Sequence, residues 1–411
     1  RGSDVKRAPR ILMLAPEPFF EPRGTPFSEY HRIKALGELG YEVDLVTYPF
    51  GRDIQMSHLR IMRSVRPPFI RGVRIGPSMV KLVLDLLLTV TAFRQALIGS
   101  YDAIHSHEEA GVLGAILSEL LGIPHLYDMH SSLPQQLHNF QYTKSSLMQG
   151  LFARAERKMI DSARVVITIC QELQDAVVAV GAGERAFLIE NVMGGDMTYE
   201  EEDSGVAKDV RANYGISSEQ PLILYTGTFE EYQGLELLTT AATCLTRSCS
   251  AARVLVVGGE PEQVAHARRL ADTAGSPMVF AGQRPPEEIP GFIAACDILV
   301  SPRVSGTNTP LKIYSYLRSG RPIVATDLRT HTQVLTSDTA VLVPPDPESL
   351  AAGLFALIQS PEKRTVLSEA ARKLAETRYS RDMYISRTAA AYKMLLGESA
   401  AAGESLEGIH A

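Results

Sequence analysis

Residues 300–327 read VSPRVSGTNTPLKIYSYLRSGRPIVATD, and this stretch contains the unit from which most of the chain is built. It starts at the end of the apolar run ILV, passes through a loop of small polar residues and a helical segment, and closes on a second apolar run, PIVA. Continuous apolar runs separated by helices are typical of parallel strands that are covered on both faces of a sheet. The loop also carries two cations, Arg303 and Lys312, which raises the question of what it holds.

The same unit recurs along the chain. Five apolar runs occur in the first half (ILMLA, VDLVT, AIHSH, LYDM, VVITI) and six in the second (LILYTG, VLVVG, VFAG, ILVSP, IVATD, VLVPP). We therefore predict an α/β fold of two Rossmann-like, doubly wound parallel-sheet domains facing a central cleft, where ligands collect beyond the carboxyl ends of the strands. Apolar periodicity stops in residues 194–215, which predicts domains at 1–200 and 210–379, with a last helix at 380–397.

The composition is that of a globular protein with ample core. The chain has 411 residues, a hydrophobic fraction of 45% and a net charge of −6, which gives no reason to expect a nucleic-acid partner. The four cysteines show no CxxC or His-paired spacing, so we expect ordinary thiols in a reducing compartment. No apolar run reaches the roughly 20 residues of a membrane-spanning helix, and a cytoplasmic location is expected.

Three glycine-containing loops follow predicted strands and precede predicted helices. The first contains Gly24 and Thr25, the second Gly227 and Thr228, and the third Gly258 beside another glycine. Glycine lets backbone N–H groups approach an anion, and the positive end of a helix dipole attracts that anion. Each loop alone is equally consistent with a structural turn, whereas three of them at strand ends favour a phosphate-bearing ligand.

The fourth loop lies in residues 300–327. Pro310 suits the first turn of a helix, and residues 307–309 (TNT) are N-cap candidates. Lys312 then lies in the first turn, where a cation opposes the helix dipole at a cost of up to about 1 kcal/mol, unless an anion docks there. Arg303 can converge on the same point from the strand end, which favours a diphosphate ligand. The alternative is a pair of solvated cations.

In their order and spacing, the motifs resemble those of the retaining glycosyltransferases of family four, which have the GT-B fold. The matching pieces cover nearly the whole chain: HRIKALGELGYEVDLVT, YDAIHSHEEAGVLGAIL, HLYDMH, IENVMGGD, YTGTFEEYQGLELL, DILVSP with YLRSGRPIVATD, and VLVPPDPESLAAGLFALI with EKRTVLSEAARKLAETRYS. The resemblance implies a nucleotide-diphosphate sugar donor held mostly by the second domain, and an acceptor held mostly by the first. It also implies retained anomeric configuration, no metal or other cofactor, and a last helix that crosses back to the first domain.

The resemblance also implies roles by position. Gly24 would approach the donor phosphate and sugar, and His130 would contact the donor sugar near the reaction centre. His107 and Glu108 would lie on the acceptor side. From the residues alone, both histidines are equally consistent with core positions at strand ends, and His331 is a further histidine that could face the cleft. The nucleotide base would be bordered by Gly282, Gln283 and Arg284.

Four positions depart from the family pattern. Family members usually carry an Arg and a Lys five positions apart after the strand-end glycine of the second domain, and Thr228 and Gln233 stand there in this chain. The usual pair of Glu residues eight positions apart, which contact the sugar hydroxyls and the ribose, is replaced by Thr307 and Ser315. The usual contacts to phosphate, sugar and ribose are therefore in doubt.

We predict that a relocated phosphate clamp compensates for these changes. Arg303 and Lys312 would bind the diphosphate and, with His130, form the predicted catalytic set. Neutral hydrogen bonds would come from Asn308, Thr309 and Ser315. In the mechanism favoured for this fold, the leaving phosphate takes the acceptor proton on the same face of the sugar, so the protein supplies positioning and electrostatic stabilisation.

The partners expected from the sequence are a nucleotide-sugar donor and a carbohydrate or lipid-linked acceptor. UDP is preferred over GDP on family frequency alone, and the product would belong to polysaccharide, glycolipid or glycoconjugate synthesis. Residues 52–81 hold seven basic residues and one acidic residue ahead of a leucine-rich helix. The segment 52–98 could therefore lie on an anionic inner membrane face or grip a lipid-diphosphate acceptor. The alternative is a solvated loop followed by an ordinary core helix.

Two other functions remain open. A catalytically degenerate GT-B protein would keep the fold and bind a nucleotide, a sugar or a partner without turnover, which the lost glutamates would explain. A nucleotide-sugar epimerase would turn over donor without an acceptor. A nicotinamide dehydrogenase is not expected, because no G-x-G-x-x-G follows either opening strand.

Overall fold

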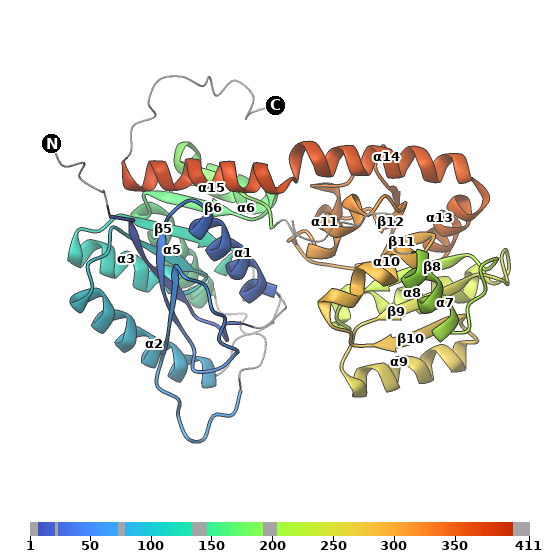
Figure 1. Cartoon of the computed structure of the whole chain (residues 1–411), viewed down its shortest axis with the longest axis horizontal. Coiled ribbons are helices and arrows are strands. Elements are labelled where there is room, and N and C mark those ends of the chain that lie inside the picture. Colours follow the sequence, from blue (N-terminus) through green and yellow to red (C-terminus); the bar gives the residue numbers. More distant parts are fainter. Residues whose placement is uncertain (1–6, 21–23, 73–78, 134–145, 192–203, 398–411) are drawn as a thin grey trace. The chain divides into compact units, whose positions relative to one another are not determined.

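The computed structural model describes residues 7–20, 24–72, 79–133, 146–191 and 204–397 (Figure 1). The chain divides into two compact units. The first comprises Arg1–Glu190 together with Tyr384–Ala411, and the second comprises Asn191–Met383. The boundary segment predicted at 194–215, with its acidic run, lies partly outside the described residues.

The first unit is built on a seven-stranded sheet in which every pair of neighbouring strands is parallel, in the order β3-β2-β1-β4-β5-β6-β7. The chain moves outward from β1 to β3 and then returns to the other side of β1, so the strand order reverses between β1 and β4. Ligands of doubly wound sheets bind beside such a reversal. The strands are β1 Arg10–Ala15, β2 Glu42–Thr47, β3 Leu59–Arg63, β4 Ala103–His107, β5 His125–Met129, β6 Val165–Thr168 and β7 Ala186–Leu188.

Helices cover this sheet. One cluster of buried side chains joins β1, β2 and β4 to α2 and α3, and another joins β5 and β6 to α5 and α6. From Tyr384 onward, α15 belongs to this unit as well. The helices are α1 Gly24–Glu38, α2 Met79–Ile98, α3 Ala110–Leu121, α5 Ser146–Ser162, α6 Gln171–Ala179, the 3₁₀ turn η1 Gly183–Arg185, and α15 Arg381–Leu396.

The second unit holds a six-stranded parallel sheet in the order β10-β9-β8-β11-β12-β13. Successive residues of β8 belong to different core clusters: Leu222 and Leu224 pack on one face, and Ile223 and Tyr225 pack on the other. Burial on both faces explains why the strands are continuous apolar runs. The strands are β8 Leu222–Thr226, β9 Arg253–Val257, β10 Met278–Gly282, β11 Ile298–Ser301, β12 Ile323–Thr326 and β13 Val341–Val343.

The helices of the second unit alternate with these strands. They are α7 Ser204–Asn213, η3 Glu231–Gln233, α8 Leu235–Leu245, α9 Pro261–Ala274, η4 Pro286–Glu288, α10 Ile289–Ala295, α11 Leu311–Arg318, α12 Arg329–Thr332, α13 Pro347–Gln359 and α14 Pro361–Arg378. Among the described helices of the chain, none is long and apolar enough to cross a membrane.

The predicted class of two doubly wound parallel sheets is confirmed, with local corrections. Strands β3 and β7 were not predicted, because β3 is only half-buried and β7 has three residues. The helix predicted after the Gly227 loop starts at Leu235 (α8), and the 3₁₀ turn η3 lies before it. The N-cap prediction for residues 307–309 is wrong: Pro310 occupies the N-cap of α11, and no side chain caps this helix.

Candidate functional site

Three glycines lie together at the carboxyl edge of the second sheet. They follow or end β8, β9 and β10, and all have left-handed backbone angles: φ is 148° at Gly227, 124° at Gly258 and 71° at Gly282. The Gly258 N–H donates to the Gly282 carbonyl at 2.8 Å, and a Cβ built on Gly258 would lie 1.9 Å from the Gly227 carbonyl oxygen. The backbone therefore forms this edge, and it leaves no room for a side chain at Gly258.

Lys312 brings a cation to this glycine edge. From the first turn of α11, its amine donates to the Thr226 carbonyl at 3.0 Å and lies 4.0 Å from the centre of the Tyr225 ring. A Cβ built on Gly227 would lie 3.3 Å from the Lys312 Nζ. Burial lowers the pKa of Lys312 well below its ordinary value, and the positive charge of Arg303 lowers it further.

Arg303 is the second cation of the loop. Its guanidinium donates to the Asn308 carbonyl at 2.7 Å and to the Thr330 hydroxyl at 2.9 Å, and it lies 4.8 Å from the centre of the Tyr232 ring. Burial lowers the pKa of Arg303 as well. Within the described residues, neither Arg303 nor Lys312 forms an ion pair with a carboxylate. Two half-buried cations without an acidic partner among the described residues carry positive charge that an anion could compensate.

The same part of the second unit offers neutral groups. Among the described residues, the Gln233 Oε1 and the Thr309 hydroxyl are buried oxygens without a hydrogen-bond partner. Ser315 is buried on α11, and Thr228 is exposed with its carbonyl accepting a hydrogen bond from the Tyr225 hydroxyl. The Thr307 carbonyl accepts a hydrogen bond from Gln333, which ties the loop to the segment after α12.

Two of the residues expected to border a nucleotide base are exposed. Gln283 and Arg284 follow β10 directly. The Arg284 guanidinium donates to the Tyr214 hydroxyl at 2.8 Å and pairs with Glu288 at 3.8 Å. His331 is fully buried between Ser301 and Thr326, and burial lowers its pKa to about 4, so it supports the ends of β11 and β12 rather than facing a ligand.

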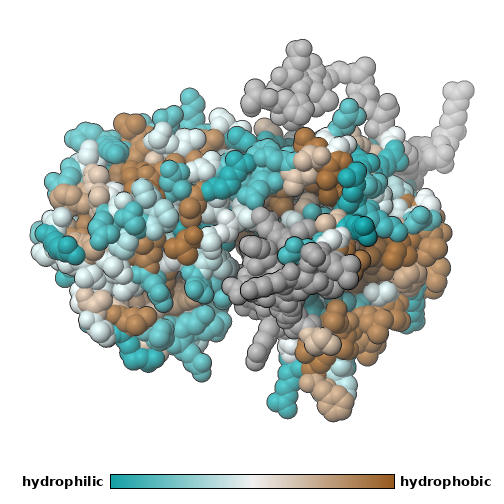
Figure 2. All heavy atoms as spheres, turned by 180° about the vertical axis from the view of Figure 1, so that it is seen from behind, coloured by the Kyte–Doolittle hydropathy of each residue, from teal (hydrophilic) through white to brown (hydrophobic). Residues whose placement is uncertain are grey.

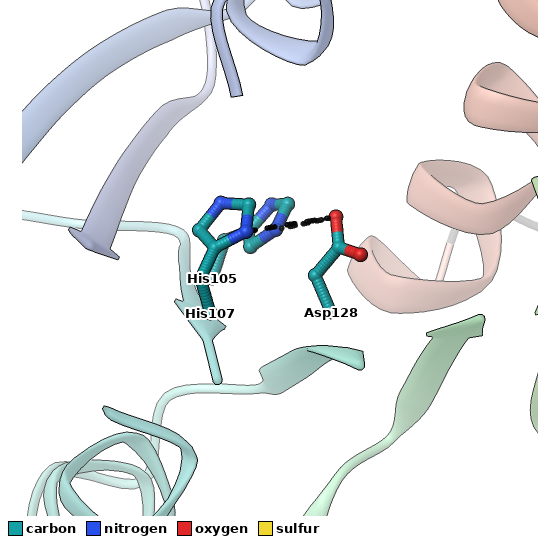
Figure 3. A group of neighbouring side chains, drawn as sticks. All are labelled: His105, His107 and Asp128. Atoms are coloured by element: carbon teal, nitrogen blue, oxygen red, sulfur yellow. Dashed lines mark ion pairs between the residues drawn. The ribbon is translucent and has the colours of Figure 1, made fainter. Parts of the chain in front are cut away.

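The first unit gathers a second group of polar residues, on β4 and β5. Residues two apart on a strand point to the same face, and the register pairs His107 with Asp128. His105, His107 and Asp128 therefore lie together, as Figure 3 shows, with His130 just beyond the end of β5. The His107 Nδ1 lies 3.3 Å from the His130 Nε2. All four side chains are buried.

Asp128 is the centre of this histidine cluster. One of its oxygens lies 3.1 Å from the His130 Nε2, and the other lies 3.3 Å from the His105 Nε2 and 3.4 Å from the Arg32 Nε. Burial alone would raise the pKa of Asp128, but the charges of His130 and Arg32 hold it well below its usual value. Burial would lower the pKa of His130, but the charge of Asp128 outweighs this effect and raises the pKa of His130. Burial and the charge of His105 lower the pKa of His107.

Helices α1 and α15 complete the cluster. Gly24 and Thr25 begin α1, which carries Arg32. The Arg32 guanidinium donates to the Thr388 hydroxyl of α15 at 2.9 Å, and the Tyr392 hydroxyl lies 2.6 Å from the His105 Nδ1. The sequence prediction missed Arg32, Asp128 and Tyr392. The alternation of His105 and His107 on a strand, followed by the DMH end of the next strand, is the signal that could have indicated the group.

Two further carboxyl groups lie near the histidines, and the Glu29 Oε1 is 3.8 Å from the His107 Nδ1. Glu108 has a φ of 49° and accepts a hydrogen bond from the Ser131 hydroxyl at 2.6 Å. Burial raises the pKa of Glu108 to about 7, against the opposing charge of His130. Burial and the neighbouring Glu17 carboxyl raise the pKa of Glu29 well above its usual value.

The donor set of the cluster does not fit a metal ion. Ligand atoms of His105, His107 and Asp128 lie within 4.8 Å of one another, as a metal site requires. However, the Arg32 guanidinium already pairs with Asp128, and the raised pKa of His130 favours a second positive charge beside the same carboxylate. A divalent cation would stand beside these two positive charges, so we assign no metal to this cluster.

Glycosyltransferase family models match both structural units of the chain. The family described as "Glycosyl transferase 4-like domain" matches residues 30–191, and "Glycosyl transferases group 1" matches residues 220–360. The D-inositol 3-phosphate glycosyltransferase of Corynebacterium kroppenstedtii is 24% identical over 81% of this chain and 77% of its own length. The phosphatidyl-myo-inositol mannosyltransferase of Mycolicibacterium smegmatis is 22% identical over 86% of each chain.

Solved structures share the fold. HepE of Anabaena in complex with UDP and glucose superposes with a TM-score of 0.72 at 19% identity, over 93% of this chain and 99% of that one. Sucrose-phosphate synthase of Thermosynechococcus elongatus gives a TM-score of 0.74 at 21% identity, over 95% and 100%. The two sheets, the two family matches and these likenesses agree, and the chain belongs to the family-four glycosyltransferases with the GT-B fold.

Proposed function

We propose that the chain transfers a sugar from a nucleotide-diphosphate donor to a hydroxyl group of an acceptor, with retention of the anomeric configuration. One observation carries the proposal: Lys312 and Arg303 stand half-buried, without a carboxylate partner in the described part of the second unit, and Lys312 lies beside the Gly227 edge. A diphosphate supplies the charge that these cations lack, and the glycines let it lie against the backbone.

The clamp would act mainly on the leaving group. As the bond to the sugar breaks, negative charge grows on the diphosphate, and fixed cations in a site with little water stabilise this charge. Lys312 and Arg303 would supply this stabilisation, and Gln233, Thr309 and Ser315 would add neutral hydrogen bonds. The leaving phosphate would then accept the acceptor's proton on the same face of the sugar, without a metal ion.

The first unit would hold the acceptor. The charged form of His130, which Asp128 favours, would donate a hydrogen bond to a hydroxyl of the donor sugar. Glu108, with its pKa raised to about 7, would accept a hydrogen bond from the acceptor hydroxyl beside His107. These assignments rest on position in the family pattern and on the geometry of the cluster.

For the substrates we propose UDP ahead of GDP in the donor, and a carbohydrate or lipid-linked hydroxyl in the acceptor. Two relatives, named for inositol 3-phosphate and for phosphatidyl-myo-inositol, support a hydroxyl-rich acceptor. The HepE structure, a complex with UDP and glucose, supports UDP as the nucleotide. Synthesis of a polysaccharide, glycolipid or glycoconjugate, in the cytoplasm, stays our prediction.

Donor turnover tests the proposal. The chain is incubated with UDP-, GDP-, ADP- and TDP-sugars, with and without inositol phosphate or a lipid extract, and the released nucleoside diphosphate is measured. We expect one of the donors to release its nucleoside diphosphate. If the bond at the anomeric carbon is axial in that donor, NMR of the product should show an axial glycosidic bond as well. Inversion of the anomeric centre would contradict retention, and release of an epimer would identify an epimerase.

The alternative is a degenerate GT-B protein that binds without turnover. The neutral residues at the usual basic and acidic positions favour it, because Thr228, Gln233, Thr307 and Ser315 replace four charged groups. Tight nucleotide binding without release of diphosphate from any donor, in the presence of every acceptor, would support this alternative against the enzyme.

A further inference from the structure

Helix α15 reaches the histidine cluster through a tyrosine. The Tyr392 hydroxyl lies 2.6 Å from the His105 Nδ1, and the other ring nitrogen of His105 lies 3.3 Å from an Asp128 oxygen. The second Asp128 oxygen lies 3.1 Å from the His130 Nε2. These side chains form a continuous row of polar contacts, which runs from α15 to the residue expected to contact the donor sugar.

Burial fixes the direction of the first contact. Tyr392 and His105 are fully buried, so other side chains form the surface drawn in Figure 2, and the tyrosine hydroxyl needs an acceptor within the protein. Burial also raises the pKa of Tyr392 well above its usual value, so the hydroxyl keeps its hydrogen and donates a hydrogen bond to the His105 Nδ1. In neutral His105 the ring hydrogen is then on Nε2, and Figure 3 shows this ring facing the Asp128 carboxylate.

The hydrogen bond to Nδ1 also disfavours a proton on that nitrogen. A hydrogen bond that is made to the neutral form of a histidine disfavours its charged form, and burial lowers the pKa of His105 in the same direction. His105 therefore faces Asp128 as a neutral N–H group. A positive charge on His105 would compete with His130 for the same carboxylate. The Tyr392 hydroxyl thus leaves the negative charge of Asp128 to His130 and Arg32.

A second contact from the same helix reaches Asp128 through Arg32. The Thr388 hydroxyl accepts a hydrogen bond of 2.9 Å from the Arg32 guanidinium. The Arg32 Nε lies 3.4 Å from the Asp128 oxygen that also faces His105. Helix α15 therefore holds both neighbours of this oxygen, whereas His130 meets the other oxygen of the carboxylate.

We propose that Tyr392 and His105 are positioning residues that hold the Asp128 carboxylate in place against His130. Neither residue would touch a substrate, because both act through Asp128. Since His130 would bind the donor sugar, the inference rests on the proposed function. The charged and titratable groups that act on His130 or on His105 are Asp128, Glu108, Glu17, Arg32, His107 and His125.

Histidine NMR of the full chain tests the proposal without any substrate. The chain is prepared with isotope-labelled histidine, the His130 signal is assigned with His130→Asn, and its titration midpoint is measured. We expect Tyr392→Phe to lower this midpoint by about half a pH unit or more, because His105 can then take up a proton and compete for Asp128. Tyr384→Phe is the matched control. Tyr384 is buried on the same helix, and its hydroxyl has no hydrogen-bond partner among the described residues.

Turnover of the donor that the parent uses tests the link to the reaction. Tyr392→Phe should lower kcat by about tenfold and leave the KM for the acceptor unchanged, because His130 would be held less firmly beside the reacting sugar. His105→Leu should lower kcat in the same way. His105→Gln should rescue part of this loss, because glutamine offers a hydrogen-bond acceptor and a donor without a charge.

Three results would overturn the proposal. The first is an unchanged or raised His130 midpoint in Tyr392→Phe. The second is an equal shift in Tyr384→Phe, because a general change of packing would then explain both. The third is a lowered midpoint with unchanged kcat, since the contacts would then not serve the reaction. If the parent turns over no donor, the proposed function fails, and the titration alone decides whether Tyr392 and His105 hold His130.

Discussion

The amine of Lys312 donates a hydrogen bond of 3.0 Å to the carbonyl oxygen of Thr226, which joins the first turn of α11 to the end of β8. The bond holds a cation beside Gly227, at the edge where Gly258 also approaches. A carbonyl oxygen and an aromatic ring offset only part of the desolvation of an ammonium group, since neither carries a full negative charge. The folded protein therefore holds this amine at a cost, which an anionic ligand would remove.

The first prediction concerns the protonation of Lys312. Because burial lowers its pKa in the folded state, the unfolded chain binds more protons at this position, and the free energy of unfolding should rise with pH toward the ordinary lysine value of about 10.4. Lys312→Met should remove this rise and stabilise the second unit near neutral pH by on the order of 1 kcal/mol. Urea unfolding at several pH values measures both effects. Lys363→Met, at an exposed lysine, is the control. If the free energy of unfolding depends on pH equally in the parent and in Lys312→Met, Lys312 is not buried as described.

A second prediction concerns the glycine edge. Gly258→Ala adds a Cβ that would meet the Gly227 carbonyl at 1.9 Å, in a left-handed conformation, and should cost about 1–3 kcal/mol. Gly275→Ala is the matched control, because φ is also positive there but nothing lies within 4 Å of the added carbon. Both variants are compared by urea unfolding and by titration with UDP. If UDP affinity falls equally in the two variants, the edge does not carry the phosphate.

The third prediction concerns the histidine cluster. Asp128→Asn keeps the shape of the side chain but removes the negative charge that His130 and Arg32 share, and leaves Arg32 buried without a counter-charge. We expect the free energy of unfolding of the first unit to fall by about 3–5 kcal/mol. Asp161→Asn serves as the control, since the two ion pairs that Asp161 forms among the described residues lie near the surface and are worth at most about 1 kcal/mol. Equal stability of the two variants would show that Asp128 does not organise the cluster.

Much of the fold could be predicted from the sequence, for a physical reason. Strands buried on both faces must be apolar throughout, so each of the eleven apolar runs matches one observed strand. Strands β3 and β7 were not predicted, because arginines interrupt the half-buried edge strand β3 (LRIMR) and β7 (AFL) has only three residues.

The sites were less predictable, because they depend on strand order. Lys312 and Gly227 are far apart in the sequence, and they meet because β11 lies next to β8. The strand-end pattern indicated a phosphate site, and the roles given to Arg303 and Lys312 stay predictions. Asp128 belongs to the HLYDMH motif but received no role, since no local pattern reveals that Arg32 and Tyr392 approach the same cluster from α1 and α15.

Calorimetric titration tests the central claim most directly. UDP, GDP, ADP and TDP are titrated into the parent, Lys312→Ala and the control Arg269→Ala, and the nucleoside of the tightest binder is titrated as well. We predict that one nucleotide binds the parent more tightly than its nucleoside does, and that Lys312→Ala weakens only the nucleotide, by about 1–3 kcal/mol. Equal nucleotide affinity in the parent and in Lys312→Ala, or no binding of any nucleotide, would contradict the diphosphate clamp.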